Sequence, residues 1–255
     1  MHVILTGATG LIGSGVLAQL LAHMKSGGPI TRVSILSRSP VPMAEGKANV
    51  VVIRHADFKN YPPEVLKELS GAEACIWALG VSQTQVGKEE YVTITQDYPL
   101  AAAQALSRLS EVFKFVYVSG THGFPGEGVT QTPGYFTPFF ARVKGETETQ
   151  LLALPKTCPS LRPFSIRPFY IDRANHPEVI EAQRHRPSMS DYYDILGPVV
   201  RRFTSIHSPT ELLGDFMIKL AVGNGAPLQG DDLLGGGRII PNKAFRRIMK
   251  EETGA

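Results

Sequence analysis

Thr6-Gly7-Ala8-Thr9-Gly10-Leu11-Ile12-Gly13 is the stretch that decides the fold, because it stands between an apolar run at 2–6 and an apolar helical pattern from residue 11 to about 24. Gly7 allows a tight turn, Gly10 lets the backbone approach a pyrophosphate, and Gly13 permits close packing of a helix on a strand. A pyrophosphate would lie at the helix N-terminus, where free N–H groups and the helix dipole favour an anion. Glycines of an ordinary turn are the alternative, but the strand before the loop and the helix after it favour a dinucleotide site. The residues that we expect to contact the dinucleotide here are Thr6, Gly7, Thr9, Gly10, Leu11, Ile12 and Gly13.

The rest of the chain alternates between apolar runs and helical patterns as far as residue 170, which predicts a doubly wound parallel α/β sheet. After Phe169 the alternation gives way to an irregular segment and two helices, at about 209–222 and 242–252. We therefore expect a single domain over 1–255, with a nucleotide-binding core at 1–170 and a small irregular C-terminal substrate cap at 171–255. The remaining predicted strands are 32–36, 50–53, 73–79, 113–119 and 161–167, and the remaining predicted helices are 64–69, 91–109 and 137–154, the last with Thr137 as its N-cap.

Composition narrows the class of protein. Hydrophobic residues make up 43% of the 255 residues and charged residues 19%, which favours a packed core over a disordered chain. The net charge is +3 without a long Lys or Arg run, so nucleic acid is not an expected partner. Two cysteines and seven histidines without metal-ligand spacing exclude a disulfide scaffold and disfavour a metal site. With neither a leader pattern nor a membrane-length apolar run, we expect a cytoplasmic protein with no membrane contact.

The choice of dinucleotide is expected to depend on the end of the second strand, where an NAD site normally has Asp or Glu. The first carboxylate of the chain is Glu45, and the strand ends instead with Ser37 and Arg38. A guanidinium suits a 2′-phosphate because its donors match the anion in two hydrogen bonds. A solvated surface role is the alternative for Arg38. We expect NADP(H) to be preferred over NAD(H).

Asp57 follows the third predicted strand and is a candidate acceptor for the adenine amino group, with helix capping as the alternative. Trp77 is expected in the sheet core or beside the cofactor. Other strand-end residues expected at the cofactor are Phe58, Leu79 and Gly80.

The glycine loop matches the TGxxGxxG form of the short-chain dehydrogenase/reductase superfamily, which the first 170 residues resemble. This resemblance implies an NAD(P)-binding Rossmann fold. Looser similarity points to the atypical branch that includes relatives of the HIV Tat-interacting protein. The segments that carry it are Ala78-Leu79-Gly80, Val86-Gly87, Gln96-Asp97-Tyr98, Lys144-Gly145-Glu146 with Glu148, and Arg167-Pro168.

The resemblance also implies catalytic roles, with one departure. In the family, a Tyr four residues before a Lys protonates the developing alkoxide, and the Lys binds nicotinamide-ribose hydroxyls and lowers the Tyr pKa. A Ser or Thr after the fifth strand holds the carbonyl oxygen. Here Lys144 is present and Ser119 or Thr121 supplies the hydroxyl, but Phe140 stands where the family has Tyr.

A phenyl ring cannot exchange a proton, so carbonyl reduction would need a replacement donor. Three candidates are Tyr135, the first choice, which lies outside the helix, His122, which titrates near neutrality, and a water held by Thr121. Loop packing is the alternative for Tyr135, and a backbone hydrogen bond is the alternative for His122.

The leading hypothesis is therefore an NADPH-dependent reductase of a small apolar carbonyl or enone-type metabolite. Phe140, Tyr135 and Phe169 are expected to line the substrate pocket. A second hypothesis is a regulator that senses NADP without catalysis, similar to the nitrogen-metabolite-repression regulator, and a third is a non-redox isomerase or cyclase. We expect a small-molecule substrate as partner and leave a homodimer open.

Overall fold

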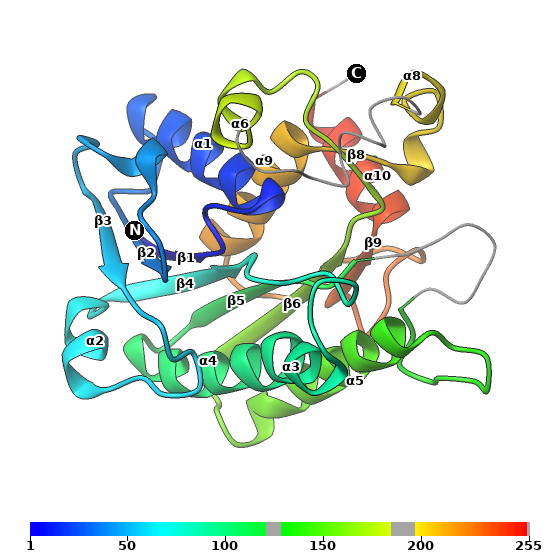
Figure 1. The fold of residues 1–255 in the computed structure, drawn as a ribbon, viewed down its shortest axis with the longest axis horizontal. Helices are drawn as coiled ribbons and strands as arrows, with labels where there is room; N and C mark the ends of the chain where they lie inside the picture. Colours follow the sequence, from blue (N-terminus) through cyan, green and yellow to red (C-terminus); the bar gives the residue numbers. More distant parts are fainter. Residues whose placement is uncertain (121–128, 185–196, 254–255) are drawn as a thin grey trace.

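The computed structural model describes residues 1–120, 129–184 and 197–253. At its centre is a seven-stranded sheet in the order β3-β2-β1-β4-β5-β6-β9, and every neighbouring pair is parallel (Figure 1). The predicted doubly wound α/β fold is confirmed. The strands are β1 (His2–Thr6), β2 (Arg32–Ser37), β3 (Val50–Arg54), β4 (Ala72–Trp77), β5 (Phe113–Val118), β6 (Leu161–Arg167) and β9 (Ile239–Pro241).

Helices cover both faces of the sheet, and each face has its own apolar core (Figure 1). Because the central strands are buried on both sides, their sequences read as apolar runs without alternation. One face carries α1 (Leu11–Lys25), α6 (Pro177–Ala182), α9 (Thr210–Val222) and α10 (Asn242–Thr253). The other carries α2 (Pro63–Glu68), α3 (Lys88–Val92), α4 (Tyr98–Leu106) and α5 (Phe139–Ala153).

The C-terminal third contributes strands that the sequence pattern did not indicate. β7 (Tyr170–Asp172) and β8 (His207–Pro209) form a separate two-stranded parallel sheet, and α8 (Gly197–Val200) lies between them in sequence. β9 pairs with β6 and extends the main sheet by one strand. These strands have three residues each, too short for a recognisable period of apolar residues.

The predicted helix at 91–109 is part of a continuous helical segment that begins at Lys88, with a π-helical turn at Thr93–Asp97 between α3 and α4. Pro99 has no N–H group to donate to the carbonyl of Thr95 four residues earlier. That carbonyl instead accepts hydrogen bonds from the hydroxyls of Tyr117 (3.2 Å) and Thr147 (3.3 Å). The π-helical turn therefore ties this helix to β5 and α5.

Two other boundaries also differ from prediction. The fourth strand ends at Trp77, so residues 78–80 form a loop at the carboxyl edge of the sheet. Helix α5 begins at Phe139, so its N-cap is Pro138 and not Thr137, and the hydroxyl of Thr137 accepts a hydrogen bond from the Gly134 N–H (2.8 Å) in the preceding loop. The core interpretation of Trp77 is confirmed, since its fully buried ring packs against Phe58 and Phe115. No described helix is long and apolar enough to cross a membrane.

The close approach of Gly145 in α5 to the preceding loop can be tested by substitution. A Cβ atom at this position of α5 would lie 2.6 Å from the carbonyl carbon of Thr130 in the preceding loop. We expect Gly145→Ala to lower the free energy of unfolding by about 1–3 kcal/mol, as overpacking does. Gly87→Ala is the matched control, because a Cβ there meets nothing within 4 Å. Urea unfolding of both variants measures the difference, and equal stabilities would contradict the contact.

Candidate functional site

The glycine loop is held by two close backbone approaches at the carboxyl edge of the sheet. Gly7 has a φ of +70°, and a Cβ atom on it would lie 2.5 Å from the carbonyl carbon of Ala78. A Cβ atom on Gly13 would lie 2.5 Å from the carbonyl carbon of Gly7. Thr6 adds a hydrogen bond, because its hydroxyl accepts from the N–H of Leu79 (3.3 Å). The ends of β1 and β4 and the start of α1 are thus one rigid unit.

The N-terminus of α1 fits an anionic group such as a pyrophosphate. Its N-cap is Gly10, where a Cβ atom would meet only the Gly7 carbonyl oxygen, at 3.3 Å, so the outer side of the residue is open. The first turn has no acidic residue and no side-chain cap, which leaves the first N–H groups without a side-chain acceptor. These N–H groups and the helix dipole favour a phosphate at this position.

Gln183 is a residue of this loop environment that the sequence analysis missed. It follows α6, is only 5% exposed, and donates hydrogen bonds from Nε2 to the Thr9 carbonyl (3.0 Å) and to the Ser14 hydroxyl (3.4 Å). It lies 174 residues from Thr9 in the chain. No local motif marks such a contact, so only the tertiary structure reveals that the C-terminal third supports the glycine loop.

Ser37 and Arg38 follow each other at the end of β2, but their side chains differ in how accessible they are to a ligand. The hydroxyl of Ser37 is used within a local turn, since it donates to the Ser39 carbonyl (2.7 Å) and accepts from the Ser39 N–H (3.2 Å). Arg38 is exposed at the carboxyl edge of the sheet. Its guanidinium is therefore accessible to an anion, whereas the side chain of Ser37 is already occupied.

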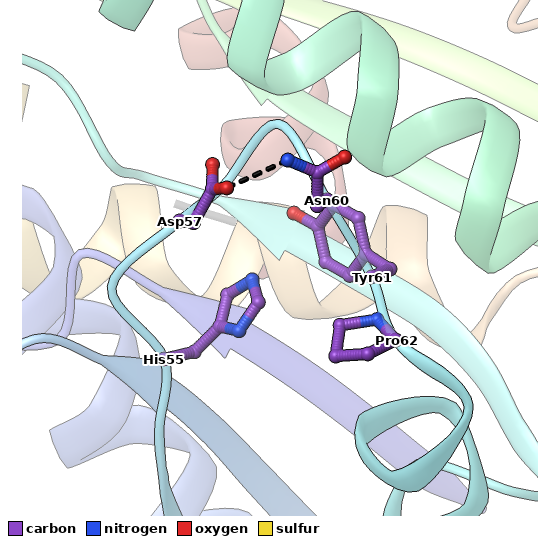
Figure 2. Close-up of a pocket in the computed structure, with 5 residues that line it drawn as sticks. All are labelled: His55, Asp57, Asn60, Tyr61 and Pro62. Carbon is purple, nitrogen blue, oxygen red and sulfur yellow. Dashed lines mark hydrogen bonds between the residues drawn. The ribbon is translucent and has the colours of Figure 1, made fainter.

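Asp57 lies in the loop after β3 and lines a pocket (Figure 2). Its carboxylate accepts from the Lys59 N–H (3.0 Å) and from the Asn60 amide (2.6 Å). These bonds, the Asn60 bond foremost, lower the pKa of Asp57, so the residue is an anion near neutral pH. The helix-capping alternative is wrong, because the N-cap of α2 is Pro62.

Burial limits how far the other residues predicted to contact a cofactor are accessible to it; these are Phe58, Leu79 and Gly80. The ring of Phe58 is fully buried against Trp77. Leu79 is half-buried and Gly80 is exposed, both in the loop after β4.

Lys144 and Ser119 lie together at the carboxyl end of β5. The ammonium of Lys144, on α5, donates to the carbonyl of Ser119. Burial lowers the pKa of Lys144 to about 8, and the nearby carboxylate of Glu148 opposes this shift. The hydroxyl of Ser119 is fully buried and has no hydrogen-bond partner in the described part of the chain. A cationic donor and an unpaired hydroxyl are thus available at one strand end.

Glu148, one turn after Lys144, forms a buried ion pair with Arg167. Arg167 donates from Nε to Oε1 (2.9 Å) and from Nη2 to Oε2, and Ser165 donates to Oε1 (2.8 Å). The side chains of Glu148 and Arg167 are 0% and 8% exposed. The Glu148 and Arg167 positions of the resemblance therefore join α5 to β6.

The structure describes three of the remaining predicted residues, namely Phe140, Phe169 and Tyr135. Phe140 is partly buried one helical turn before it, and Phe169 is partly buried after β6. Tyr135 is 93% exposed and meets Phe136 edge to face, with ring centroids 5.3 Å apart. Thr121 and His122 lie outside the described residues.

Sequence comparison identifies relatives over most of the chain. Leucinostatins biosynthesis cluster protein T of Purpureocillium lilacinum is 31% identical over 246 residues, which covers 88% of this chain and 86% of that protein. The chain belongs to its family. Botcinic acid biosynthesis cluster B protein 16 of Botryotinia fuckeliana is 38% identical over 159 residues, covering 59% of this chain and 97% of that protein. No family model matches the sequence.

Structure comparison supports the fold. A double mutant of DesIV, a dTDP-glucose 4,6-dehydratase from Streptomyces venezuelae with NAD bound, superposes with a TM-score of 0.64 at 16% identity. The match covers 100% of this chain and 82% of that chain. The chain therefore has the Rossmann fold of NAD-binding enzymes. The Tat-interacting-protein branch stays a prediction.

The buried ion pair yields the second prediction. Glu148→Gln leaves the guanidinium of Arg167 buried without a counter-charge, which costs about 3–5 kcal/mol of unfolding free energy. The matched control is Glu181→Gln, which breaks an exposed pair with Arg184 and changes stability by less than about 1 kcal/mol. Calorimetry of both variants measures the change in unfolding free energy. A loss of less than about 1 kcal/mol in Glu148→Gln would show that the ion pair does not stabilise the fold.

Proposed function

We propose that the protein is an NADP(H)-dependent reductase of a small apolar carbonyl or enone-type metabolite, acting within a biosynthetic cluster as its relatives' names suggest. The observation that carries the proposal is the hydrogen bond, at the end of β5, from the ammonium of Lys144 to the carbonyl of Ser119, whose own hydroxyl is buried without a partner in the described part of the chain. In a parallel sheet this end faces the same edge as the glycine loop, where doubly wound folds bind ligands.

The cofactor would be held by residues along that edge. The N-terminus of α1 holds the pyrophosphate, Arg38 contacts the 2′-phosphate, and Lys144 contacts the hydroxyls of the nicotinamide ribose. The bound nicotinamide supplies a hydride equivalent. The exposed guanidinium of Arg38 and the lack of a carboxylate before Glu45 support NADP(H) over NAD(H).

Lys144 and Ser119 also offer a route for the proton. The hydroxyl of Ser119 is buried without a partner in the described part of the chain, so a substrate oxygen that reaches it supplies the missing hydrogen bond. The ammonium of Lys144, bonded to the carbonyl of the same residue, is a proton source near neutral pH. This route needs no phenol at position 140. Tyr135 as donor requires a movement of its loop, because its side chain is almost fully exposed.

A second candidate is an NADP-binding regulator or a non-redox enzyme on the same fold. Phe140 favours it, because the position one turn before Lys144 carries no exchangeable proton. In that case the protein binds NADP(H) but does not oxidise NADPH with any carbonyl substrate, and Phe140→Tyr gains that reaction.

The cofactor assignment gives the third prediction. We expect NADPH to bind at least tenfold more tightly than NADH, a difference of about 1.4 kcal/mol or more. Arg38→Glu should narrow or reverse this ratio, because a carboxylate repels the 2′-phosphate and accepts from a 2′-hydroxyl. Arg32→Glu, at the opposite end of β2, should leave it unchanged. Titration calorimetry with both nucleotides measures the ratio, and equal wild-type affinities would refute the preference.

The proton route gives the fourth prediction. Lys144→Met should weaken NADPH binding about tenfold and lower kcat by ~10²–10⁴, the usual contribution of an acid. The melting temperature should stay equal or rise, since the native state no longer buries a charge whose pKa is lowered to about 8. Wild-type turnover should fall as pH rises through about 8, where the ammonium loses its proton.

The variant Tyr135→Phe distinguishes proton donation through Lys144 and Ser119 from proton donation by the phenol of Tyr135. If Lys144 and Ser119 provide the proton, Tyr135→Phe retains full kcat. A loss of ~10²–10⁴ in Tyr135→Phe, with kcat retained in Lys144→Met, would instead assign proton donation to Tyr135.

A further inference from the structure

A cavity of about 1340 Å³ lies along the outer side of α1. Its walls come from α1, from residues 40–49 between β2 and β3, and from α6. Parallel strands are usually joined by a crossover that contains an α-helix. The crossover from β2 to β3 instead contains only the 3₁₀ turn Pro42–Ala44, so it adds no full helix beside α1 (Figure 1). The cavity is the space that this short connection leaves open.

The cavity follows the whole length of α1. Its lining includes Thr9, two residues before the helix, and Lys25, the last residue of the helix. A helix of 15 residues is about 22 Å long. The volume also exceeds the ~300–1,000 Å³ of most small-molecule pockets. A site of this shape suits an elongated ligand better than a compact one.

The middle of the cavity is apolar. On α1 it is lined by Ala18, Leu21 and Ala22, which share one helical face because they are three and four residues apart. Val41 and Met43 of the connection between β2 and β3 also line it. Ala22 is exposed, and Leu21 and Met43 are partly buried, so this apolar surface is accessible from solvent. Moving the apolar part of a ligand from water onto this surface is favourable.

One end of the cavity is basic and lies at the amino edge of the sheet. Lys25 ends α1 and precedes β2, and Lys47 precedes β3. The carbonyl of Asn49 accepts a hydrogen bond from the N–H of Val33 (2.9 Å), which holds the start of β3 beside the start of β2. Glu45 also lines the cavity, in the same turn as Lys47, so this end carries a single net positive charge.

The other end of the cavity is acidic and lies near the carboxyl edge of the sheet. Glu178 and Glu181 line it from α6, and Glu181 pairs with Arg184. The amide of Gln183, directly after α6, donates to the carbonyl of Thr9 (3.0 Å), which places the end of α6 at the N-terminus of α1. An anionic group is therefore repelled from this end and attracted to the basic one.

We propose that the cavity binds an elongated apolar molecule that ends in a carboxylate, with its apolar body along α1 and its carboxylate at Lys25 and Lys47. Among the described residues, the lysines that form ion pairs are Lys59 and Lys219, so both cavity lysines are available to a ligand. They lie at the opposite edge of the sheet from the glycine loop, so the carboxylate site is separate from the expected dinucleotide contacts. The site therefore does not depend on the proposed function.

The test is titration calorimetry of the full chain with dodecanoate, below the concentration at which it forms micelles. Ala22→Trp puts a large side chain into the middle of the cavity and should weaken dodecanoate binding about tenfold or more. Ala153→Trp is the matched control, because Ala153 is an equally exposed alanine of a helix, α5, and does not line the cavity. It should leave the affinity for dodecanoate unchanged.

The charge of the ligand is tested separately. Lys25→Ala combined with Lys47→Ala should weaken dodecanoate binding about fivefold, as expected for two exposed charge pairs. Lys67→Ala combined with Lys156→Ala removes the same charge outside the cavity and should have no effect. Dodecyltrimethylammonium should bind the wild type more weakly than dodecanoate. No binding of dodecanoate, or wild-type affinity in Ala22→Trp or in the Lys25 and Lys47 double variant, would overturn the proposal. Binding of the cationic amphiphile as tightly as dodecanoate, or more tightly, would also overturn it.

Discussion

The close approach of the Gly7 turn to the end of β4 is the constraint on which the rest of the structure depends. With the carbonyl of Ala78 where a side chain of residue 7 would be, the chain can turn there only without a Cβ atom. This turn aims the N-terminus of α1 at the carboxyl edge of the sheet. Because the strands are parallel, the ends of β2, β3 and β5 lie at this same edge.

The protein treats its buried polar groups in two different ways. Glu148, Arg167 and Ser165 satisfy one another, and Thr95 gains two hydroxyl donors where Pro99 removes the regular one. These groups join elements of the core. By contrast, Ser119, His55 and Tyr61 keep buried polar atoms without partners in the described part of the chain. Ser119 and His55 directly follow β5 and β3, and Tyr61 lies just before α2. An unpaired buried polar atom is costly, so each one calls for an explanation.

Lys144 lies near members of both sets of buried polar groups, because it donates to the carbonyl of Ser119 and precedes Glu148 by one helical turn. Its ammonium is partly removed from water, which lowers its pKa, while the carboxylate of Glu148 one turn later limits that shift. Glu148 is itself neutralised by Arg167, so it can support Lys144 only weakly. Burial therefore dominates the lowered pKa of Lys144, and the carboxylate that joins α5 to β6 opposes that shift.

The sequence alone determined the fold and the position of the glycine loop. Both depend on local patterns: apolar runs long enough to be strands, and a glycine triplet between the first strand and the first helix. It also named Lys144, Ser119, Arg38 and Asp57 as candidate site residues, because strand ends of a parallel sheet share one edge. The π-helical turn at 93–97 had a local signal in Pro99, but its stabilising contacts come from other elements.

Only the tertiary structure decided which of these groups are already used. The hydroxyl of Ser37 is occupied in its own turn, while that of Ser119 has no partner among the described residues, although both are strand-end serines. Gln183 reaches the glycine loop from a distant part of the chain, and the cavity beside α1 is lined by segments as far apart in the sequence as α1 and α6. Hydrogen-bond occupancy and burial depend on contacts between residues far apart in sequence or on the exact path of a loop. No local pattern of residue types encodes them.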